Sequence, residues 1–554
     1  MTRHAILSLF VVAVVIFSAG CGGSGKKTDQ KNDSTKTDSG MQKKLAQFAT
    51  FKLTTDMSKL SDKEKQMIPL LIDAAMIMDD LYWMQTYGNK DEFLATIKDE
   101  DAKKFANINY GPWERLNDNQ PFLEGAKVKT PGVNFYPADI TKEEFEKLAD
   151  KDKKSQYTVI VRNPDKSLKV VWYHEYYKDK LSKASDLIKQ AAALCEDAGL
   201  KKYLELRADA LMTSNYKPSD MAWMDMKTNK IDFICGPIEN YEDGLFGYKS
   251  AFEGFVLVKD MEWSNKLGKF TGMLPILQKK LPVEDKYKKE VPAAGSDLGV
   301  YDAIYYAGDC NAGSKTIAIN LPNDEDVQLK KGSRRLQLKN SMKAKFDNIL
   351  MPIAKTLMDP SQMKNVKFDA FFTNVMFHEV GHGLGIKKTV NGKGFVRDAL
   401  KDLYSGIEEA KADILGLFMA TTLIEMKEIT NITAEDCYVT FVAGIFRSVR
   451  FGAASAHGKA NMMCFNFFED NKAFTVNNDG TYKVDFVKVK EVVNLWAAKI
   501  ITWQGNGDYD GLKAYFEKNS NIRPALQKEL DRLKTANIPV DIIFDQGKQT
   551  LGLK

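Results

Sequence analysis

The sequence predicts a mainly helical α+β protein, built from a mixed α/β portion and a mainly helical portion. Two patterns carry this prediction. Short runs of β-branched and aromatic residues, separated by glycine and proline, recur between residues 157 and 323. From residue 341 to about residue 534, apolar residues recur at helical spacing instead. The composition, with 44% hydrophobic and 28% charged residues, is that of an ordinary globular protein.

The N-terminus is predicted to be an export signal followed by a lipid anchor. Residues 1–20 contain an apolar run too short to span a membrane, and small residues precede Cys21. The pattern resembles a bacterial lipoprotein cleavage site, although Ser18 stands where such sites usually carry Leu. We therefore expect Cys21 to be lipidated and to anchor the protein in a bacterial cell envelope, on the periplasmic face or the outer-membrane surface. The alternative is signal cleavage nearby that leaves Cys21 unmodified.

The elements after the signal can be placed in order. Residues 21–44 are mostly Gly, Ser, Thr, Lys and Asp and are expected to be a flexible tether. Ser61 to Glu64 has the pattern of a capping box and opens a helix that should end near Gly88. Prolines make residues 105–140 irregular. The next expected elements are strands at 157–162 and 168–173, helices from 174 to about 209, and strands at 231–234, 236–241, 252–258 and 316–323.

This order divides the chain beyond the tether into two lobes. We expect a mixed α/β lobe from residues 45–260, 301–345 and the C-terminal tail, and a helical lobe from residues 261–300 and 346–535. The 79 basic and 74 acidic residues give a net charge of +5, which does not indicate nucleic-acid binding. The five cysteines other than Cys21 have no C-x-x-C spacing, so we expect mostly buried free thiols.

The helical portion carries a metal-binding pattern at residues 378–382. His378 and His382 are four residues apart, so on a helix they project from the same face and can reach one metal ion. Glu379 lies beside them and can accept a proton. The chain has only five histidines, which makes a chance His-Glu-x-x-His rare; two histidines packed in a core helix is the alternative. A hydrolytic zinc site needs a third protein ligand, and no histidine follows six residues after His382.

An acidic segment at residues 408–413 is the candidate source of that third ligand. Glu408, Glu409 and Asp413 begin a helix that is otherwise small and apolar, where carboxylates are costly to bury unless they bind something. One carboxylate can ligate zinc, and Asp413 can hold a ligand imidazole through its free N–H. The alternative is a solvated acidic helix start that the helix dipole favours.

These motifs resemble those of a known family. His-Glu-x-x-His-Gly-Leu-Gly followed by Glu-Glu-Ala-Lys-Ala-Asp-Ile is similar to the dipeptidyl peptidase III family of zinc metallopeptidases, closest to the branch whose domain also occurs fused to Nudix hydrolases. The segments 238–241, 252–255, 319–323 and 456–457 are similar to the family's substrate-binding and cleft segments. The resemblance implies two lobes around a wide cleft, with zinc on the helical lobe and a small β-barrel-like sheet in the other.

The resemblance also implies roles around the metal. The implied ligands of one zinc ion per chain are His378, His382 and Glu409. Glu379 would be the general base, while Tyr241 and His457 would stabilise the oxyanion. Glu408 and Asp413 would support the ligands from the second shell.

Four further residues are implied to hold the peptide. Glu239 and Glu253 would meet the free amino terminus, and Asn320 and Asn323 would fix the peptide backbone by strand addition. Without the resemblance, the two asparagines would be turn formers and Tyr241 an ordinary packed aromatic residue.

The chain departs from the family pattern at two places. The best-known members have one more residue between the two histidines, and an arginine where this chain has Asn461. The predicted function is a zinc-dependent exopeptidase that releases dipeptides from short peptides, as a monomer or homodimer. The alternatives are a peptide-binding lipoprotein without turnover, and a zinc endopeptidase or other amidohydrolase. No Nudix box is found.

Overall fold

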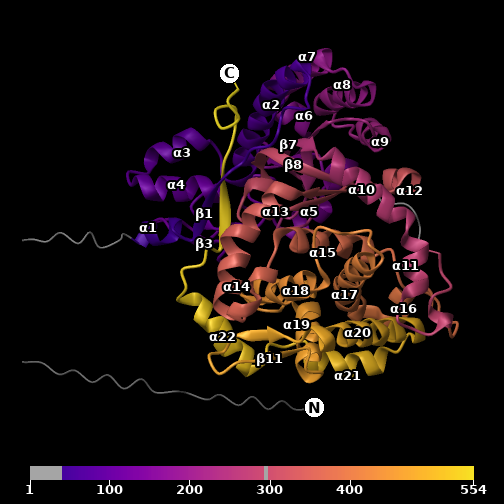
Figure 1. Ribbon diagram of the computed structural model, residues 1–554. Helices are drawn as coiled ribbons and strands as arrows, with labels where there is room; N and C mark the ends of the chain where they lie inside the picture. The colour runs from indigo at the N-terminus through magenta and orange to yellow at the C-terminus, as the bar shows by residue number, and fades with distance from the viewer. Residues whose placement is uncertain (1–39, 292–296, 554) are drawn as a thin grey trace, which may run out of the picture. The chain divides into compact units, whose positions relative to one another are not determined.

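The computed structural model describes residues 40–291 and 297–553. The predicted signal peptide, the lipidation site Cys21 and the tether up to residue 39 lie outside these residues. The described chain begins with α1 (Gly40–Leu45), which contains the last residues of the predicted tether. Within the described part, no helix combines the length and apolar character needed to cross a bilayer. The mainly helical α+β class with a mixed sheet is confirmed (Figure 1).

The N-terminal half is mostly helical and contains two small hairpins. Its longest helix, α2 (Asp62–Thr86), begins with the predicted capping box, because the Ser61 hydroxyl accepts from Glu64 N and the Glu64 carboxylate accepts from Ser61 N. The other helices are α3 (Lys90–Thr96), α4 (Glu100–Asn109), α5 (Lys142–Lys147), α6 (Tyr173–Tyr176), α7 (Lys178–Leu194), α8 (Ala198–Thr213) and α9 (Lys217–Asp225). The hairpins are β2 (Trp113–Glu114) with β3 (Gln120–Pro121), and β4 (Thr158–Arg162) with β5 (Leu168–Trp172).

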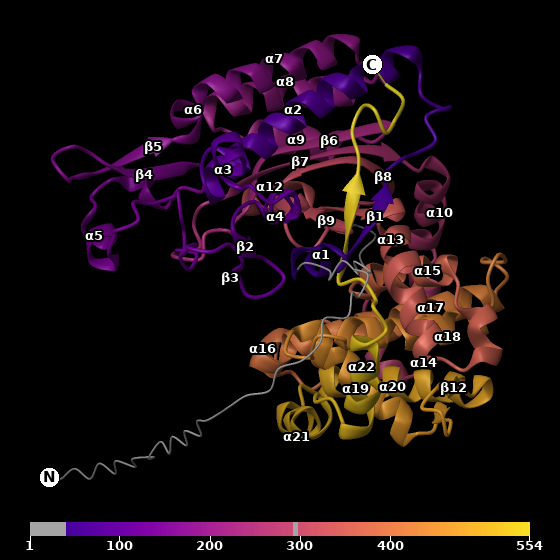
Figure 2. The ribbon, with the colours of Figure 1, turned by 90° about the vertical axis from the view of Figure 1, so that its left-hand side faces the viewer.

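One five-stranded sheet forms the centre of the α/β portion, with α2, α7 and α8 stacked on one side of it (Figure 2). Its strands are β6 (Ile231–Glu239), β7 (Ala251–Lys259), β8 (Asp297–Gly308), β9 (Ala318–Leu321) and β10 (Arg334–Leu338). They pair in the order β6-β7-β8-β10-β9, and only β8 and β10 are parallel. The strands β6 and β9 are therefore the edges of the sheet, and the predicted barrel-like closure is not confirmed. The two runs predicted at 231–234 and 236–241 are the single strand β6, which contains a register shift between Pro237 and Glu239.

The rest of the chain contributes β8, β9 and β10 to the sheet and is otherwise mostly helical; from residue 341 onward it is helical as predicted, with one interruption. Its helices are α10 (Met261–Gly272), α11 (Leu274–Lys280), α12 (Glu325–Lys331), α13 (Lys339–Lys345), α14 (Met351–Leu357), α15 (Phe368–Gly381), α16 (Val396–Leu400), α17 (Tyr404–Glu425), α18 (Ala434–Val449), α19 (Ala456–Asp470), α20 (Phe486–Asn506), α21 (Tyr509–Asn519) and α22 (Pro524–Lys534). The hairpin of β11 (Phe474–Val476) and β12 (Tyr482–Val484) interrupts the region predicted to be helical. Near the end of the chain, β13 (Asp541–Asp545) pairs in parallel with β1 (Phe48–Lys52).

The buried apolar residues form two clusters. One cluster draws on residues 53–258 and 301–338, and the other on residues 267–300 and 342–538. The described cysteines are all free thiols, and each of them except Cys195 is buried, as expected. The helices α15 and α17, which carry the metal-binding motifs, belong to the second cluster.

Candidate metal centre

Two glycines allow the two motif-bearing helices to pack closely. A Cβ atom on Gly381 would lie 2.8 Å from the Ala412 carbonyl oxygen, and one on Gly416 would lie 2.8 Å from His378 N. Any larger residue at either position would push α15 and α17 apart. This close approach brings His378 on α15 next to Glu409 on α17, although the two residues belong to separate motifs.

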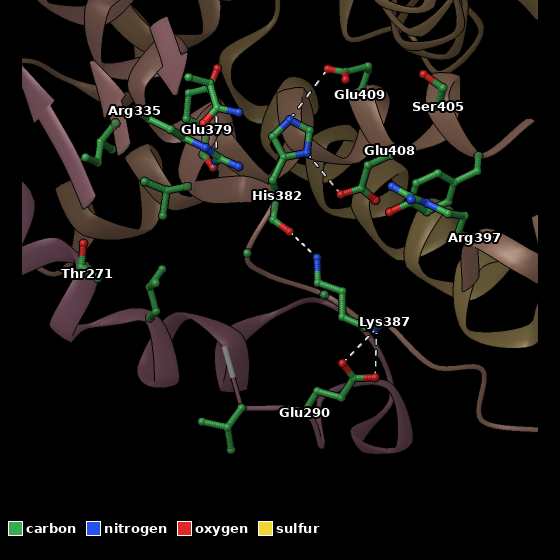
Figure 3. A pocket seen from close by; sticks show the side chains of 18 of the residues that line it. Thr271, Glu290, Arg335, Glu379, His382, Lys387, Arg397, Ser405, Glu408 and Glu409 are labelled. Atoms are coloured by element: carbon green, nitrogen blue, oxygen red, sulfur yellow. Dashed lines mark hydrogen bonds and ion pairs between the residues drawn. The ribbon is translucent and has the colours of Figure 1, made fainter. Parts of the chain in front are cut away.

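The imidazoles of the His-Glu-x-x-His motif face the Glu409 carboxylate. His378 Nε2 lies 3.3 Å and His382 Nε2 lies 3.8 Å from Glu409 Oε2. Tetrahedral zinc with bonds of about 2.0–2.1 Å keeps its ligand atoms roughly 3.3 Å apart, close to both distances. His382 is the C-cap residue of α15, one residue beyond the end of the helix. Figure 3 shows its ring between Glu408 and Glu409.

A carboxylate holds the second nitrogen of each imidazole. His378 Nδ1 lies 2.6 Å from Asp413 Oδ1, and His382 Nδ1 lies 3.2 Å from Glu408 Oε1. Burial lowers the pKa of His378, but the charges of Asp413 and Glu409 outweigh burial and raise it to about 10. Carboxylates in these positions fix the orientation of ligand imidazoles in metal sites and leave Nε2 for the ion.

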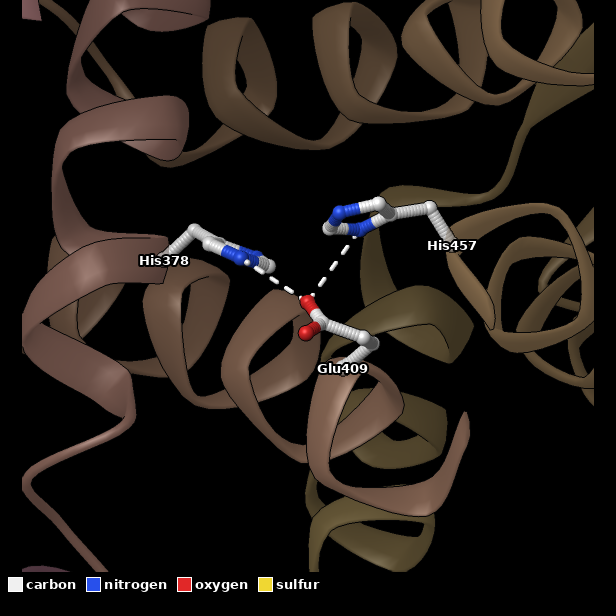
Figure 4. A group of neighbouring side chains, drawn as sticks. All are labelled: His378, Glu409 and His457. Atoms are coloured by element: carbon white, nitrogen blue, oxygen red, sulfur yellow. Dashed lines mark ion pairs between the residues drawn. The ribbon is translucent and has the colours of Figure 1, made fainter. Parts of the chain in front are cut away.

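A third imidazole reaches the same oxygen. His457 Nδ1, from α19, lies 3.1 Å from Glu409 Oε2, and the His457 side chain is 62% exposed (Figure 4). Two possible ligand sets therefore share His378 and Glu409, and differ in having His382 or His457 as the third member. The carboxylate that orients His382 favours the first set, since among the described residues His457 has no such support.

The donor set fits a zinc ion. Glu409 Oε2 is buried and accepts no hydrogen bond from any described residue, although three imidazole nitrogens lie within 3.8 Å of it. A buried carboxylate oxygen without a donor is costly unless a cation is bound there. Imidazole nitrogens and a carboxylate oxygen are common zinc ligands.

Three supporting residues were not singled out from the sequence. Lys411 is fully buried, and its Nζ lies 2.7 Å from Glu408 Oε1; burial lowers the pKa of Lys411 to about 8. The other Glu408 oxygen accepts from Gln504 Nε2 at 3.0 Å. Asn461, noticed only as a departure from the family pattern, donates to Asp413 Oδ2 at 3.1 Å. Lys411 lies within the acidic motif, whereas Gln504 and Asn461 come from other helices and carry no sequence signal.

Glu379 borders two cavities that meet at the metal centre. A larger one of about 1020 Å³ is lined by Glu379, His382, Glu408, Glu409 and, from the edge strand β9, Asn320. A second of about 560 Å³ is lined by Glu379, His378 and His457 and extends along α18. Arg335 of β10 contacts Glu379 twice: its Nη1 donates to Glu379 O at 2.8 Å and lies 3.4 Å from Glu379 Oε2.

The residues predicted to hold the amino terminus lie close together, where the end of β6 meets the segment that follows β9. Asn323 Nδ2 donates to Ile238 O at 3.1 Å and to Glu239 Oε1 at 3.3 Å. Glu253, on the neighbouring strand β7, is only 5% exposed. Burial, with the nearby charges of Asp309 and Glu239, raises the pKa of Glu253 well above its ordinary value.

Tyr241, the predicted oxyanion-stabilising residue, follows β6 in a turn and is 83% exposed. Like Glu239, Glu253 and Asn323, it is absent from the described lining of both cavities that border Glu379.

Comparisons with known proteins find similar proteins over most of the chain. Residues 127–397 match the family described as Peptidase family M49. The structure is similar to that of DPP III from Caldithrix abyssi, with a TM-score of 0.84 and 40% identity over 90% of this chain and 98% of that one. It is also similar to dipeptidyl-peptidase III from Corallococcus sp. strain EGB, with a TM-score of 0.72 and 37% identity over 91% and 96% of the two chains.

Sequence relatives include the plant protein Nudix hydrolase 3 of Arabidopsis thaliana. It is 33% identical over 568 residues, which cover 91% of this chain and 73% of that protein. Together with the two bacterial structures, this similarity extends well beyond the metal-binding motifs. The chain therefore belongs to peptidase family M49, the dipeptidyl peptidase III family, whose members are zinc-dependent metallopeptidases that release dipeptides.

Proposed function

We propose that this chain is a zinc-dependent exopeptidase that removes dipeptides from the amino termini of short peptides. One zinc ion per chain would be held by His378, His382 and Glu409. The observation that carries the proposal is the buried Glu409 oxygen, which lies within 3.8 Å of two imidazole nitrogens and accepts no well-aligned hydrogen bond from the described residues.

In this proposal, the metal and the base have separate roles in peptide hydrolysis. When bound, zinc supplies Lewis acidity, which polarises a peptide carbonyl and makes water easier to deprotonate. Glu379, beside the metal ligands in both cavities, accepts the proton of the attacking water and then donates it to the leaving amine. Arg335 keeps the Glu379 side chain and backbone in position through its contacts with both.

The acidic cluster at Glu239, Glu253 and Asp309 supports recognition of a free amino terminus. A buried carboxyl group such as Glu253 is destabilised in its charged form, and a substrate ammonium group supplies the missing counter-charge. Fixing the amino terminus at a set distance from Glu379 would determine how many residues are released, and this is the physical basis proposed for dipeptide specificity.

The edge strand β9 supports binding of an extended peptide. Because β9 pairs only with β10, its other edge can accept a peptide strand, and the exposed Asn320 and the Asn323 side chain lie along it. In this proposal the peptide lies in a wide cleft between two lobes. His457 and Tyr241 would stabilise the oxyanion, which requires the exposed Tyr241 side chain to reach the scissile carbonyl when peptide is bound.

Incubation with a peptide library, followed by mass spectrometry of the products, tests this function. Dipeptides released stepwise from amino termini are expected, and blocking the amino group by acetylation should abolish release. Cleavage within acetylated peptides would instead indicate an endopeptidase. A zinc-loaded protein that cleaves no peptide would indicate a binding protein, an alternative that the family and the presence of Glu379 disfavour.

We also propose that Cys21 is lipidated and anchors a monomer or homodimer in the bacterial cell envelope, on the periplasmic face or the outer-membrane surface. The support is the sequence pattern around Cys21. Labelled palmitate should enter the wild-type protein and not the Cys21→Ser variant. Equal labelling of both would overturn the anchor.

A further inference from the structure

The second cavity beside Glu379 carries positive charge that the proposed mechanism does not use. From His378 and His457 it extends along α18 to Arg447 and Arg450, and it is bordered on another side by Ile317 and Ala318, at the start of β9. The cavity therefore joins the reacting centre to two guanidinium groups.

Neither arginine has a carboxylate partner within ion-pair distance among the described residues. Arg447 Nε is buried without a hydrogen bond, and its guanidinium lies 5.7 Å from the centre of the Phe371 ring. Arg450 donates only to backbone, to the carbonyl oxygens of Ile538 and Pro539 at 2.6 Å each. Burial lowers the pKa of both groups, and the charge of Asp541 offsets only part of this effect at Arg447.

The carboxylates in the same cavity already have partners. Asp541 lies 3.1 Å from Lys345 and also accepts from Lys315 N. Asp413 holds His378 and accepts from Asn461. The Arg447 charge is therefore left for a ligand, and Arg–carboxylate contacts are strong and geometrically specific.

The direction of the peptide places its carboxyl end in this cavity. If the amino terminus lies at Glu239 and Asn323, a peptide on the edge of β9 runs antiparallel to it, past Asn320 and towards Ile317. At about 3.3 Å per residue, the six-residue step from Asn323 to Ile317 corresponds to roughly 20 Å. A peptide of about five to eight residues would end beside α18.

We propose that Arg447, with Arg450 beside it, binds the C-terminal carboxylate of a short peptide substrate. This proposal rests on the proposed function, since it takes the peptide direction from the amino-terminal anchor. It gives the site a second anchor, so that peptides are selected by length as well as by their free amino terminus. It also supplies the buried Arg447 Nε with the acceptor that the described residues do not provide.

Binding measurements in a background without hydrolysis test the proposal. Full-length, zinc-loaded Glu379→Gln protein is titrated calorimetrically with peptides of four to nine residues that have no acidic side chains, each as free acid and C-terminal amide. At the length that reaches α18, the free acid should bind about tenfold more tightly than the amide. Adding Arg447→Gln should abolish this preference, and adding Arg447→Lys should leave part of it.

The matched control is Lys459→Gln, which removes one positive charge from the exposed face of α19, outside both cavities. The preference for the free acid should remain in this variant. Equal binding of acid and amide at every length would overturn the proposal, as would a preference that survives Arg447→Gln. An amidated peptide ending in Glu that binds as tightly as the free acid would assign the cavity to acidic side chains and overturn the C-terminal assignment.

The proposed function and this inference can fail separately. If wild-type protein releases no dipeptides while the acid preference persists and depends on Arg447, the peptidase assignment fails and the carboxylate site stands. If Arg447→Gln does not fold, the comparison of free-acid and amidated peptides in the Glu379→Gln protein still tests the proposal. Equal binding of the two forms to that protein would refute the carboxylate site.

Discussion

Glu408 and Glu409 are adjacent in the chain but face different groups, so replacing each by glutamine should give different results. Glu409 Oε2 lies among imidazole nitrogens and accepts no hydrogen bond from the described residues. Glu408 instead contacts His382 Nδ1 at 3.2 Å and Lys411 Nζ at 2.7 Å. We therefore predict that Glu409→Gln lowers zinc affinity, whereas Glu408→Gln mainly lowers the stability of the metal-free protein.

The contacts set the expected magnitudes. Glu409→Gln replaces an anionic ligand and should weaken zinc binding more than the 10–100-fold typical of losing a supporting residue, or by more than about 2.7 kcal/mol. It also removes the charge that helps to raise the pKa of His378, so metal-free stability should fall, but by less than in Glu408→Gln. Glu408→Gln should weaken zinc binding by about 10–100-fold and, because it leaves the buried Lys411 ammonium unpaired, should cost roughly 3–5 kcal/mol of unfolding free energy.

Two measurements separate these effects. Zinc affinity is measured by competition with a chelator, and unfolding free energy by urea titration of the chelator-treated protein. If Glu408→Gln loses zinc while Glu409→Gln retains it at near wild-type affinity, the assignment of the ligand among the adjacent acids is wrong.

Three further predictions concern the base, the choice between histidines and the helix packing. Glu379→Gln should retain zinc and lose about 10²–10⁴-fold in kcat, and equal peptide cleavage by this variant would refute the mechanism. His382→Ala should lose zinc and His457→Ala should retain it with slower turnover; the opposite metal contents would favour the alternative ligand set. Gly416→Ala should cost about 1–3 kcal/mol of unfolding free energy, because its Cβ would meet the neighbouring helix backbone at 2.8 Å. Gly268→Ala in α10, where no atom lies within 4 Å, is the control and should not destabilise the protein.

Much of the fold could be predicted from local patterns. The capping box at Ser61, the strands with Gly and Pro between them, and the helical C-terminal half depend on residues close together in the chain, whose spacing reveals helix or strand directly. The hairpin of β11 and β12 was missed because its strands have three residues each, too few for a clear alternation. The order of the central sheet could not be predicted either, since pairing depends on contacts between distant segments.

The candidate site, too, could be predicted from the sequence only in part. By itself, the sequence determined which residues have metal chemistry, because His378, Glu379 and His382 are spaced for one helix face and the acids at 408–413 are costly to bury without a partner. Only the tertiary structure decided which atoms meet. It brought Glu409 Oε2 among three imidazoles, added Asn461, Gln504 and Lys411 as supports, and left Tyr241 exposed. Local spacing fixes the face of a helix on which a side chain lies, but its partner depends on how closely two helices pack, and here glycines at 381 and 416 allow that approach.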